Sequence, residues 1–235
     1  MILVFPQASK TFNLFYRDIR LSSKGLENYV SMITKAYDSK YIDEILLIVL
    51  ESFAYKNELN QVFKKNFTQA KVNILVLIRE TQGSMCTLLM AINKLKNQSV
   101  LISSLDQMLL GPQLDIDLFV NGDCDIQVPI FLSDKPFFSY ILRDDENQVI
   151  QVIEKRVISN EAIMGFYFIK NFSDFFDEAI KLLEKYKGFR ERIFFISDVI
   201  NSFLISKKTV SFPKFFSQDY YKLKNISEFE MVIKK

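Results

Sequence analysis

The 235-residue chain contains no histidine and no tryptophan, and it has only two cysteines and six glycines. Without histidine, the sequence excludes His-based catalytic triads, His-ligated metals and histidine general bases. The two cysteines, Cys86 and Cys124, are too few for a disulfide framework or a zinc site and fit a reducing compartment. Any chemistry is therefore left to carboxylates, lysine, arginine and backbone amides.

Long apolar runs and an excess of one charge are also missing. No apolar run approaches the roughly 20 residues that a membrane helix needs, and Met1–Phe5 is too short for a signal peptide. Thirty basic against 28 acidic residues leave a formal charge of +2, which argues against general nucleic-acid binding. We expect a cytoplasmic protein that binds neither nucleic acid nor membrane.

Apolar runs and helical stripes alternate along the first half of the chain. Runs at 2–5, 45–50, 75–78 and 100–102 predict buried strands, and stripes at 26–37, 55–63 and 85–95 predict the helices between them. This alternation predicts an α/β fold with a Rossmann-like, mostly parallel mixed sheet flanked by helices. Residues 6–13 are expected to form a loop, and Ser84 to cap the third helix.

The second half of the sequence has a different pattern, with predicted strands that follow one another closely rather than alternating with helices. We expect a short mixed element at 115–120, strands at 126–131, 137–142, 149–154 and 209–212, and helices at 172–186 and 223–232. Asp144 to Asn147 have the composition of a hairpin turn. At this length the chain can bury one substantial core, so we expect a single domain over residues 1–235.

Asp106 is the first candidate site residue. It follows the buried strand 100–102, and ligands bind at the carboxyl edge of a parallel sheet. Thr81-Gln82-Gly83-Ser84-Met85-Cys86-Thr87 and Ser104-Leu105-Asp106-Gln107 flank the helix and strand of this stretch. Together they resemble the sugar-nucleotide pyrophosphorylases, a nucleoside-triphosphate transferase family with a Rossmann-like nucleotidyltransferase domain.

The resemblance continues in the second half of the chain. Glu154-Lys155 and the segment Asn160 to Gly165 are similar to two strands that face the acceptor in this family, although Arg156 replaces a proline. It implies that Glu154, Asn160 and Gly165 bind the acceptor and that Lys155 meets its phosphate. It also implies that Asp106 and Asp198 hold Mg²⁺, an ion that prefers a few carboxylates plus phosphate oxygens and water.

The resemblance assigns nucleotide binding to the first half. It implies that Gln82, Gly83 and Ser84 contact the base and that Ala8, Ser9, Lys10 and Thr11 contact the triphosphate, with Lys155, Asp106 and Lys10 as the catalytic set. It therefore divides the domain into a nucleotide-binding half, 1–107, and an acceptor-binding half, 108–235. The family's triphosphate loop is glycine-rich, whereas residues 6–13 contain no glycine, and a side chain hinders the close approach of amides to phosphate.

Three functions follow as alternatives. The first is transfer of a nucleoside monophosphate from a nucleoside triphosphate to a sugar phosphate or similar phosphorylated metabolite, with pyrophosphate release, in bacterial capsule or lipopolysaccharide synthesis. The second is a catalytically inactive relative that binds a nucleotide or sugar nucleotide. The third is a glycosyltransferase that uses the D-x-D motif Asp123-Cys124-Asp125, although Asn121-Gly122-Asp123 is typical of a solvated turn. Whether the protein forms a homo-oligomer is left open.

Overall fold

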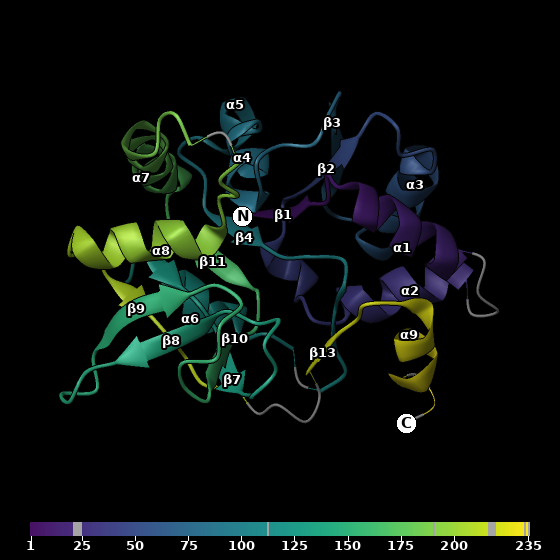
Figure 1. Ribbon diagram of the computed structural model, residues 1–235. Helices are drawn as coiled ribbons and strands as arrows, with labels where there is room; N and C mark the ends of the chain where they lie inside the picture. The colour runs from purple at the N-terminus through teal and green to yellow at the C-terminus, as the bar shows by residue number, and fades with distance from the viewer. Residues whose placement is uncertain (21–24, 112, 190, 216–219, 233, 235) are drawn as a thin grey trace. The chain divides into compact units, whose positions relative to one another are not determined.

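A computed structural model describes residues 1–20, 25–111, 113–189, 191–215, 220–232 and 234 (Figure 1). The chain divides into two compact units built from interleaved segments. Unit 1 contains residues 1–80, 103–116 and 218–235, and unit 2 contains residues 81–102 and 117–217. These units combine segments from both predicted halves of the domain, so the division into nucleotide-binding and acceptor-binding halves stays a prediction about function.

Three parallel strands form the core of unit 1. They lie in the order β1 (Ile2–Pro6), β2 (Glu44–Leu50) and β3 (Lys71–Leu77), with Ile2 opposite Glu44 and Leu50 opposite Leu77. β1 and β2 are almost fully buried, as expected for parallel strands covered on both faces. The accompanying helices are α1 (Lys10–Arg20), α2 (Gly25–Thr34) and α3 (Lys56–Asn66), with a 3₁₀ turn at Ser39–Tyr41.

A short two-stranded antiparallel sheet, formed by segments far apart in the sequence, completes unit 1. β5 (Gln107–Leu109) pairs antiparallel with β13 (Tyr220–Lys222), and α9 (Ile226–Val232) follows and contacts α1. Asn225 accepts a hydrogen bond from the Glu228 amide, and the Glu228 carboxylate accepts one from the Lys224 amide. This reciprocal cap fixes where α9 begins.

Unit 2 contains two groups of strands. In the first, β11 (Tyr167–Ile169) lies between β4 (Val100–Ile102) and β6 (Ile126–Gln127), antiparallel to both, and β12 (Val210–Ser211) runs parallel to β6. In the second, the antiparallel order is β7 (Ile130–Leu132), β10 (Glu161–Ile163), β8 (Tyr140–Arg143) and β9 (Val149–Ile153).

The two longest helices of unit 2 pack together beside the second group of strands. α7 (Phe172–Lys185) contacts α8 (Ile196–Ile205), and α8 contacts β9, as Figure 1 shows. The Asn201 side chain bonds both the amide and the carbonyl of Val152, each at 2.7 Å, and so fixes α8 against β9. The shorter helices are α4 (Ser84–Leu89), α5 (Ile92–Leu95) and α6 (Ile116–Asn121), the last where the chain passes from unit 1 to unit 2.

The structure confirms the α/β class with a mostly parallel mixed sheet flanked by helices, but several predicted boundaries are wrong. Residues 10–20 form helix α1 rather than continuing a loop. The helix expected over 85–95 is interrupted after Leu89, and the strand expected over 126–131 is broken at Val128-Pro129. Proline lacks the amide that a continuous strand would need there.

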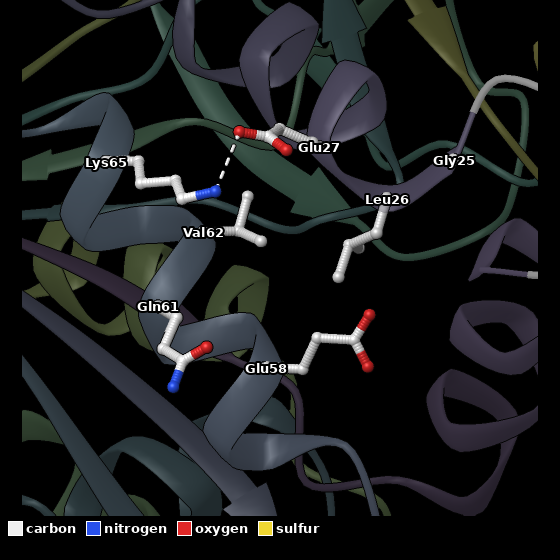
Figure 2. Close-up of a pocket in the computed structure, with 7 residues that line it drawn as sticks. All are labelled: Gly25, Leu26, Glu27, Glu58, Gln61, Val62 and Lys65. Carbon is white, nitrogen blue, oxygen red and sulfur yellow. Dashed lines mark hydrogen bonds and ion pairs between the residues drawn. The ribbon is translucent and has the colours of Figure 1, made fainter.

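An open pocket of about 520 Å³ lies between α2 and α3 in unit 1, and Figure 2 shows the residues that line it. The Lys65 ammonium lies 3.1 Å from a Glu27 carboxylate oxygen and links the two helices across it. No residue of the predicted site lines this pocket. Over the described residues, no helix is both long enough and apolar enough to span a membrane.

Candidate functional site

The turn that precedes α1 carries the first predicted site residues. Only Gln7, Ala8 and Ser9 separate β1 from α1, so Lys10 and Thr11 lie in the first helical turn rather than in a loop. The Ser9 hydroxyl accepts a hydrogen bond from the Phe12 amide at 3.1 Å, which is an N-terminal cap. A Glu80 carboxylate oxygen accepts the Lys10 amide at 2.8 Å.

Most amides of this turn already have partners inside the chain. The Gln7 amide donates to the carbonyls of Phe5 and Ile48, the Ser9 amide to the Gln7 carbonyl, and the Asn13 amide to the Ser9 carbonyl. A glycine-rich phosphate loop instead leaves such amides pointing at the ligand. In this conformation, therefore, a triphosphate would compete with internal acceptors, including the negative charge of Glu80.

Asp106 belongs to the same part of unit 1. The Gln7 side-chain amide donates to the Ser104 hydroxyl at 3.1 Å, and the Ser103 amide donates to the Val4 carbonyl at 3.0 Å. These bonds hold the segment before Asp106 against the end of β1. One Asp106 oxygen, Oδ2, lies 3.3 Å from the Lys222 ammonium, whereas Oδ1 is buried and has no hydrogen-bond partner within the described part of the chain. We call Ser9, Lys10, Glu80, Asp106 and Lys222 the unit-1 cluster.

The buried phenol of Tyr29 lies near enough to Asp106 for the carboxylate charge to affect its pKa. Burial, and then the nearby negative charge of Asp106, raise the pKa of Tyr29 well above its ordinary value. Its hydroxyl donates to the Leu105 carbonyl and not to the aspartate. Tyr29 therefore stays neutral and supports the backbone of the cluster rather than exchanging protons.

In unit 2, the loop around Gly83 lies against the segment that enters α8. The Phe194 amide donates to the Gln82 carbonyl at 2.7 Å, and the Met85 amide donates to the Phe194 carbonyl at 3.2 Å. Gly83 has φ of +108°, and a Cβ placed there would lie 2.3 Å from the Phe194 carbonyl oxygen. Only glycine fits this close approach. Gly83, not Ser84, is the N-cap of α4, so the predicted Ser84 cap is wrong.

Glu154 is held by two serines from different elements. Its Oε2 accepts hydrogen bonds from the Ser139 hydroxyl and, at 3.0 Å, from the Ser197 hydroxyl. Its Oε1 lies 4.0 Å from the Lys155 ammonium, which in turn lies 4.9 Å from the centre of the Phe195 ring. This arrangement orients one carboxylate oxygen and presents an ammonium group whose side chain is 59% exposed.

The positions around this pair are also constrained. Lys155 has φ of +52°, a left-handed backbone conformation that is uncommon for a residue with a side chain. Burial, and then the charge of Glu154, raise the pKa of Tyr167 far above its ordinary value, so that its phenol remains neutral beside the carboxylate. A fixed carboxylate and an exposed ammonium thus lie together at the end of β9.

Asp198 has two partners near the start of α8. Its Oδ2 accepts the Phe195 amide at 2.8 Å, and its Oδ1 lies 3.0 Å from the Arg192 guanidinium. The Arg192 guanidinium also stacks on the Tyr186 ring at 3.7 Å. Asp198 therefore caps α8, the ordinary alternative for an aspartate at a helix start. Gly83, Ser139, Glu154, Lys155, Ser197 and Asp198 are called the unit-2 cluster.

The predicted magnesium ligands do not present a ready site. Within the described ranges, no group of three or more cysteine, aspartate or glutamate side chains could hold a metal ion. Asp106 is ion-paired to Lys222 in unit 1, and Asp198 to Arg192 in unit 2. Magnesium accepts few distortions of its octahedral oxygen shell. A resident ion does not fit these paired carboxylates as they stand.

The other predicted residues have mixed positions. Asn160 is exposed and its carbonyl accepts the Ser133 amide, while Gly165 lies between β10 and β11 with φ of +86°. In the D-x-D motif, Asp125 accepts hydrogen bonds from the amide and hydroxyl of Thr209 and so fixes the start of β12. Asp123 is fully exposed and lies 3.7 Å from Lys170, as in a solvated turn.

Four residues of the two clusters were not among the predicted site residues. Glu80, Ser139 and Lys222 belong to no motif, and Ser197 directly precedes Asp198 in the sequence; each meets its partner from a distant part of the chain or from another element. For Lys222 the contact depends on the pairing of β13 with β5. The position of Glu80, directly before Thr81-Gln82-Gly83, could also have drawn notice.

The fold is similar to those of solved nucleotide-sugar pyrophosphorylases and related nucleotidyltransferases. A nucleoside-diphosphate-sugar pyrophosphorylase from Vibrio cholerae RC9 matches over 100% of both chains, with a TM-score of 0.77 and 16% identity. A putative glucose-1-phosphate thymidylyltransferase from Bacillus anthracis matches 98% of this chain and 92% of its own, with a TM-score of 0.73 and 13% identity.

A similar structure with a different acceptor is the inositol-1-phosphate CTP transferase of T. maritima, with a TM-score of 0.68 and 12% identity over 99% of this chain and 94% of its own. No protein-family model matches the chain, and no curated protein matches its sequence. The likeness at these identities is one of fold, and it confirms the fold that the sequence resemblance implied.

Proposed function

We propose that this protein is a nucleotidyltransferase that joins a nucleoside monophosphate to a phosphorylated small molecule, most simply a sugar phosphate, and releases pyrophosphate. The observation that supports it best is the arrangement of Glu154 and Lys155 on a fold shared with nucleotide-sugar pyrophosphorylases. The fixed carboxylate accepts a hydroxyl hydrogen, and the exposed ammonium meets a phosphate. A sugar phosphate offers both groups on one molecule.

The acceptor's phosphate oxygen attacks the α-phosphorus of the triphosphate, and the bond to the pyrophosphate oxygen breaks. Negative charge gathers on the transferred phosphoryl group, so positioning and fixed positive charge do most of the catalysis. In this proposal Lys155 holds the acceptor phosphate and Glu154 its hydroxyls, with Asn160 and Gly165 beside them. Gln82, Gly83 and Ser84 contact the base, and Ala8, Ser9, Lys10 and Thr11 the triphosphate.

The family resemblance implies Mg²⁺ at Asp106 and Asp198, but each aspartate already has a cationic partner in its own unit, and the pair does not offer a site for a resident ion. Any magnesium in this reaction would be carried by the triphosphate, whose phosphate oxygens it would neutralise. The reaction belongs to the cytoplasm and to bacterial capsule or lipopolysaccharide synthesis, and a homo-oligomer is compatible with it.

A second candidate is a relative that binds a nucleotide, a sugar nucleotide or a phosphorylated sugar without turnover. The observation that favours it is the internally bonded turn before α1, where Glu80 already takes the Lys10 amide. The unit-2 cluster would then bind its ligand while the unit-1 cluster contributes no transfer.

The deciding experiment is a pyrophosphate-release screen of four nucleoside triphosphates against a panel of sugar and other metabolite phosphates, with magnesium. Transfer predicts release with one acceptor, reduced in Lys155→Met and unchanged in Lys185→Met, a lysine that also lies over an aromatic ring. Release that survives loss of both Asp106 and Asp198 would contradict the roles given to those aspartates. Silence across the panel, with a ligand-induced rise in melting temperature, would favour the second candidate.

A further inference from the structure

Lys222 is fixed beside Asp106 by backbone pairing. Lys222 lies opposite Gln107 in the β13–β5 pair, and the Leu223 amide donates to the Asp106 carbonyl at 2.7 Å. The cap formed by Asn225 and Glu228 then starts α9 immediately after this strand. The backbone of Lys222 is therefore held on both sides, which places its side chain beside Asp106.

Only one oxygen of Asp106 is open to a ligand. Oδ1 has almost no exposed surface and no hydrogen-bond partner among the residues that the structure describes, so an ion from solvent cannot reach it without rearrangement. Oδ2 already lies 3.3 Å from the Lys222 ammonium, and both side chains are 30% exposed. Partial burial weakens screening by water, so the charge of Lys222 acts strongly on anything that approaches this oxygen.

We propose that the Lys222 ammonium takes the place of a divalent metal ion at Asp106. The unit-1 cluster would then meet the phosphates of its ligand with a fixed protein cation. A magnesium ion at Oδ2 would need a metal–oxygen distance of about 2.0–2.1 Å and would share that oxygen with an ammonium group of like charge. Repulsion between the two cations excludes the metal as long as the lysine remains.

This inference rests on the proposed function only where it assigns phosphates to the unit-1 cluster. The exclusion of metal from Asp106 depends on the ion pair and on the buried Oδ1 alone. The lysine also balances a partly buried carboxylate charge that would otherwise be costly.

The test is Mn²⁺ binding to the intact 235-residue chain, measured by the loss of the free-ion electron paramagnetic resonance signal, without nucleotide or acceptor. We expect no binding at Asp106 in the wild-type protein. Lys222→Met should bind one ion at least tenfold more tightly, and Lys222→Met combined with Asp106→Asn should lose it. Lys222→Arg keeps a cation at this position and should resemble the wild-type protein.

Lys208→Met is the matched control. Lys208 pairs with Asp174 at 2.5 Å in unit 2, and those side chains are 30% and 33% exposed, close to the values at Lys222 and Asp106. Equal Mn²⁺ binding by Lys208→Met would mean that any uncovered aspartate binds the ion, and would overturn the proposal. So would wild-type binding that Asp106→Asn abolishes, or a folded Lys222→Met protein that gains no binding.

These results can be separated from a failure of the proposed function. Mn²⁺ binding is read without turnover, so a chain that releases no pyrophosphate still gives an answer. Conversely, pyrophosphate release with wild-type Mn²⁺ exclusion at Asp106 would support transfer and the lysine substitution together.

Discussion

The unit-1 and unit-2 clusters treat their charges in opposite ways. In unit 1, Glu80 accepts the Lys10 backbone amide and Lys222 forms an ion pair with the open oxygen of Asp106, so both carboxylates already have partners within the chain. In unit 2, two serines hold one oxygen of Glu154, while the other oxygen and the exposed Lys155 ammonium lie 4.0 Å apart. In the unit-1 cluster, contacts within the chain occupy the groups that a ligand would need. In the unit-2 cluster, such contacts orient Glu154 and leave the Lys155 ammonium available.

The difference indicates which of the two binding functions of this fold, triphosphate binding or acceptor binding, is lost more easily. Amides that cradle phosphate lose their availability when nearby carbonyls or a carboxylate accept them. A carboxylate and a lysine that read hydroxyl and phosphate remain competent as long as their supporting side chains keep them in place. We therefore expect acceptor recognition to be retained more fully than triphosphate recognition.

The largest expected effect on activity comes from substitution of Lys155. Lys155→Met should lower pyrophosphate release, or ligand affinity in the absence of turnover, by about 100-fold, because it removes the cation that meets the acceptor phosphate. Initial rates and ligand titrations at constant ionic strength measure this loss. Lys185→Met, which removes a lysine over the Tyr186 ring, should leave both quantities unchanged. Equal effects of the two variants would remove Lys155 from the site.

Gly83→Ala should be the most destabilising substitution in the unit-2 cluster. The new Cβ would meet the Phe194 carbonyl oxygen at 2.3 Å in a left-handed backbone conformation, and we expect a loss of about 3 kcal/mol in the free energy of unfolding. Gly188→Ala separates the two causes, because Gly188 has φ of +102° and no described residue within 4 Å of its added Cβ.

Urea denaturation of both glycine variants gives the comparison. Gly188→Ala should cost only the backbone strain, about 1 kcal/mol. Similar losses in the two proteins would mean that the Gly83 loop moves away from Phe194 at little cost, and that the contact between these segments does not shape the cluster.

Ser197→Ala and Ser139→Ala should have intermediate effects. Each removes a hydroxyl that orients Glu154 without touching the ligand, and we expect about a tenfold fall in kcat/KM, near 1.4 kcal/mol. Because the serines act through Glu154, neither should lower the rate further once Glu154 is changed to glutamine. Ser202→Ala breaks a similar serine–glutamate bond at Glu178 and should leave kcat/KM unaltered. Additive losses with Glu154→Gln would refute the positioning role.

Glu80→Gln should have the smallest effect on stability, and it tests the contact between Glu80 and the Lys10 amide at the start of α1. It removes a negative charge from the start of α1, and we expect a stability loss of about 0.5–1 kcal/mol at low ionic strength. The loss should shrink as salt is added, because an exposed charge is screened. A loss that salt does not reduce would show that Glu80 acts through packing rather than charge.

Several features could be predicted because their signals are local. Continuous apolar runs identified β1 and β2, and the stripe from Leu26 to Ile33 identified α2. Asp144 to Asn147 form the predicted turn between β8 and β9, where the Asp144 carboxylate accepts the amides of Glu146 and Gln148. In each case the physical cause lies within a few residues.

Other features depend on partners that the sequence does not indicate. Helix α1 begins at Lys10 because Ser9 caps it and Glu80, 70 residues away, accepts an amide at its start. Asp198 could be a metal ligand or a helix cap as far as its neighbours in sequence show. Its contacts with Arg192 and the Phe195 amide appear only when the chain is folded.

The sequence by itself determined the α/β class, most of the long strands and helices, and the resemblance to nucleotide-sugar pyrophosphorylases. Hydrophobic periodicity and short motifs depend only on residues that are close together in the sequence, so they can be recognised without the structure. Only the tertiary structure decided which side chains are paired: Lys222 with Asp106, Arg192 with Asp198, and two serines with Glu154. The contacts of Lys222 and of the two serines follow from strand register and the meeting of separate segments, and that of Arg192 from the local path of the chain into α8. Together they control which side chains remain available to a ligand.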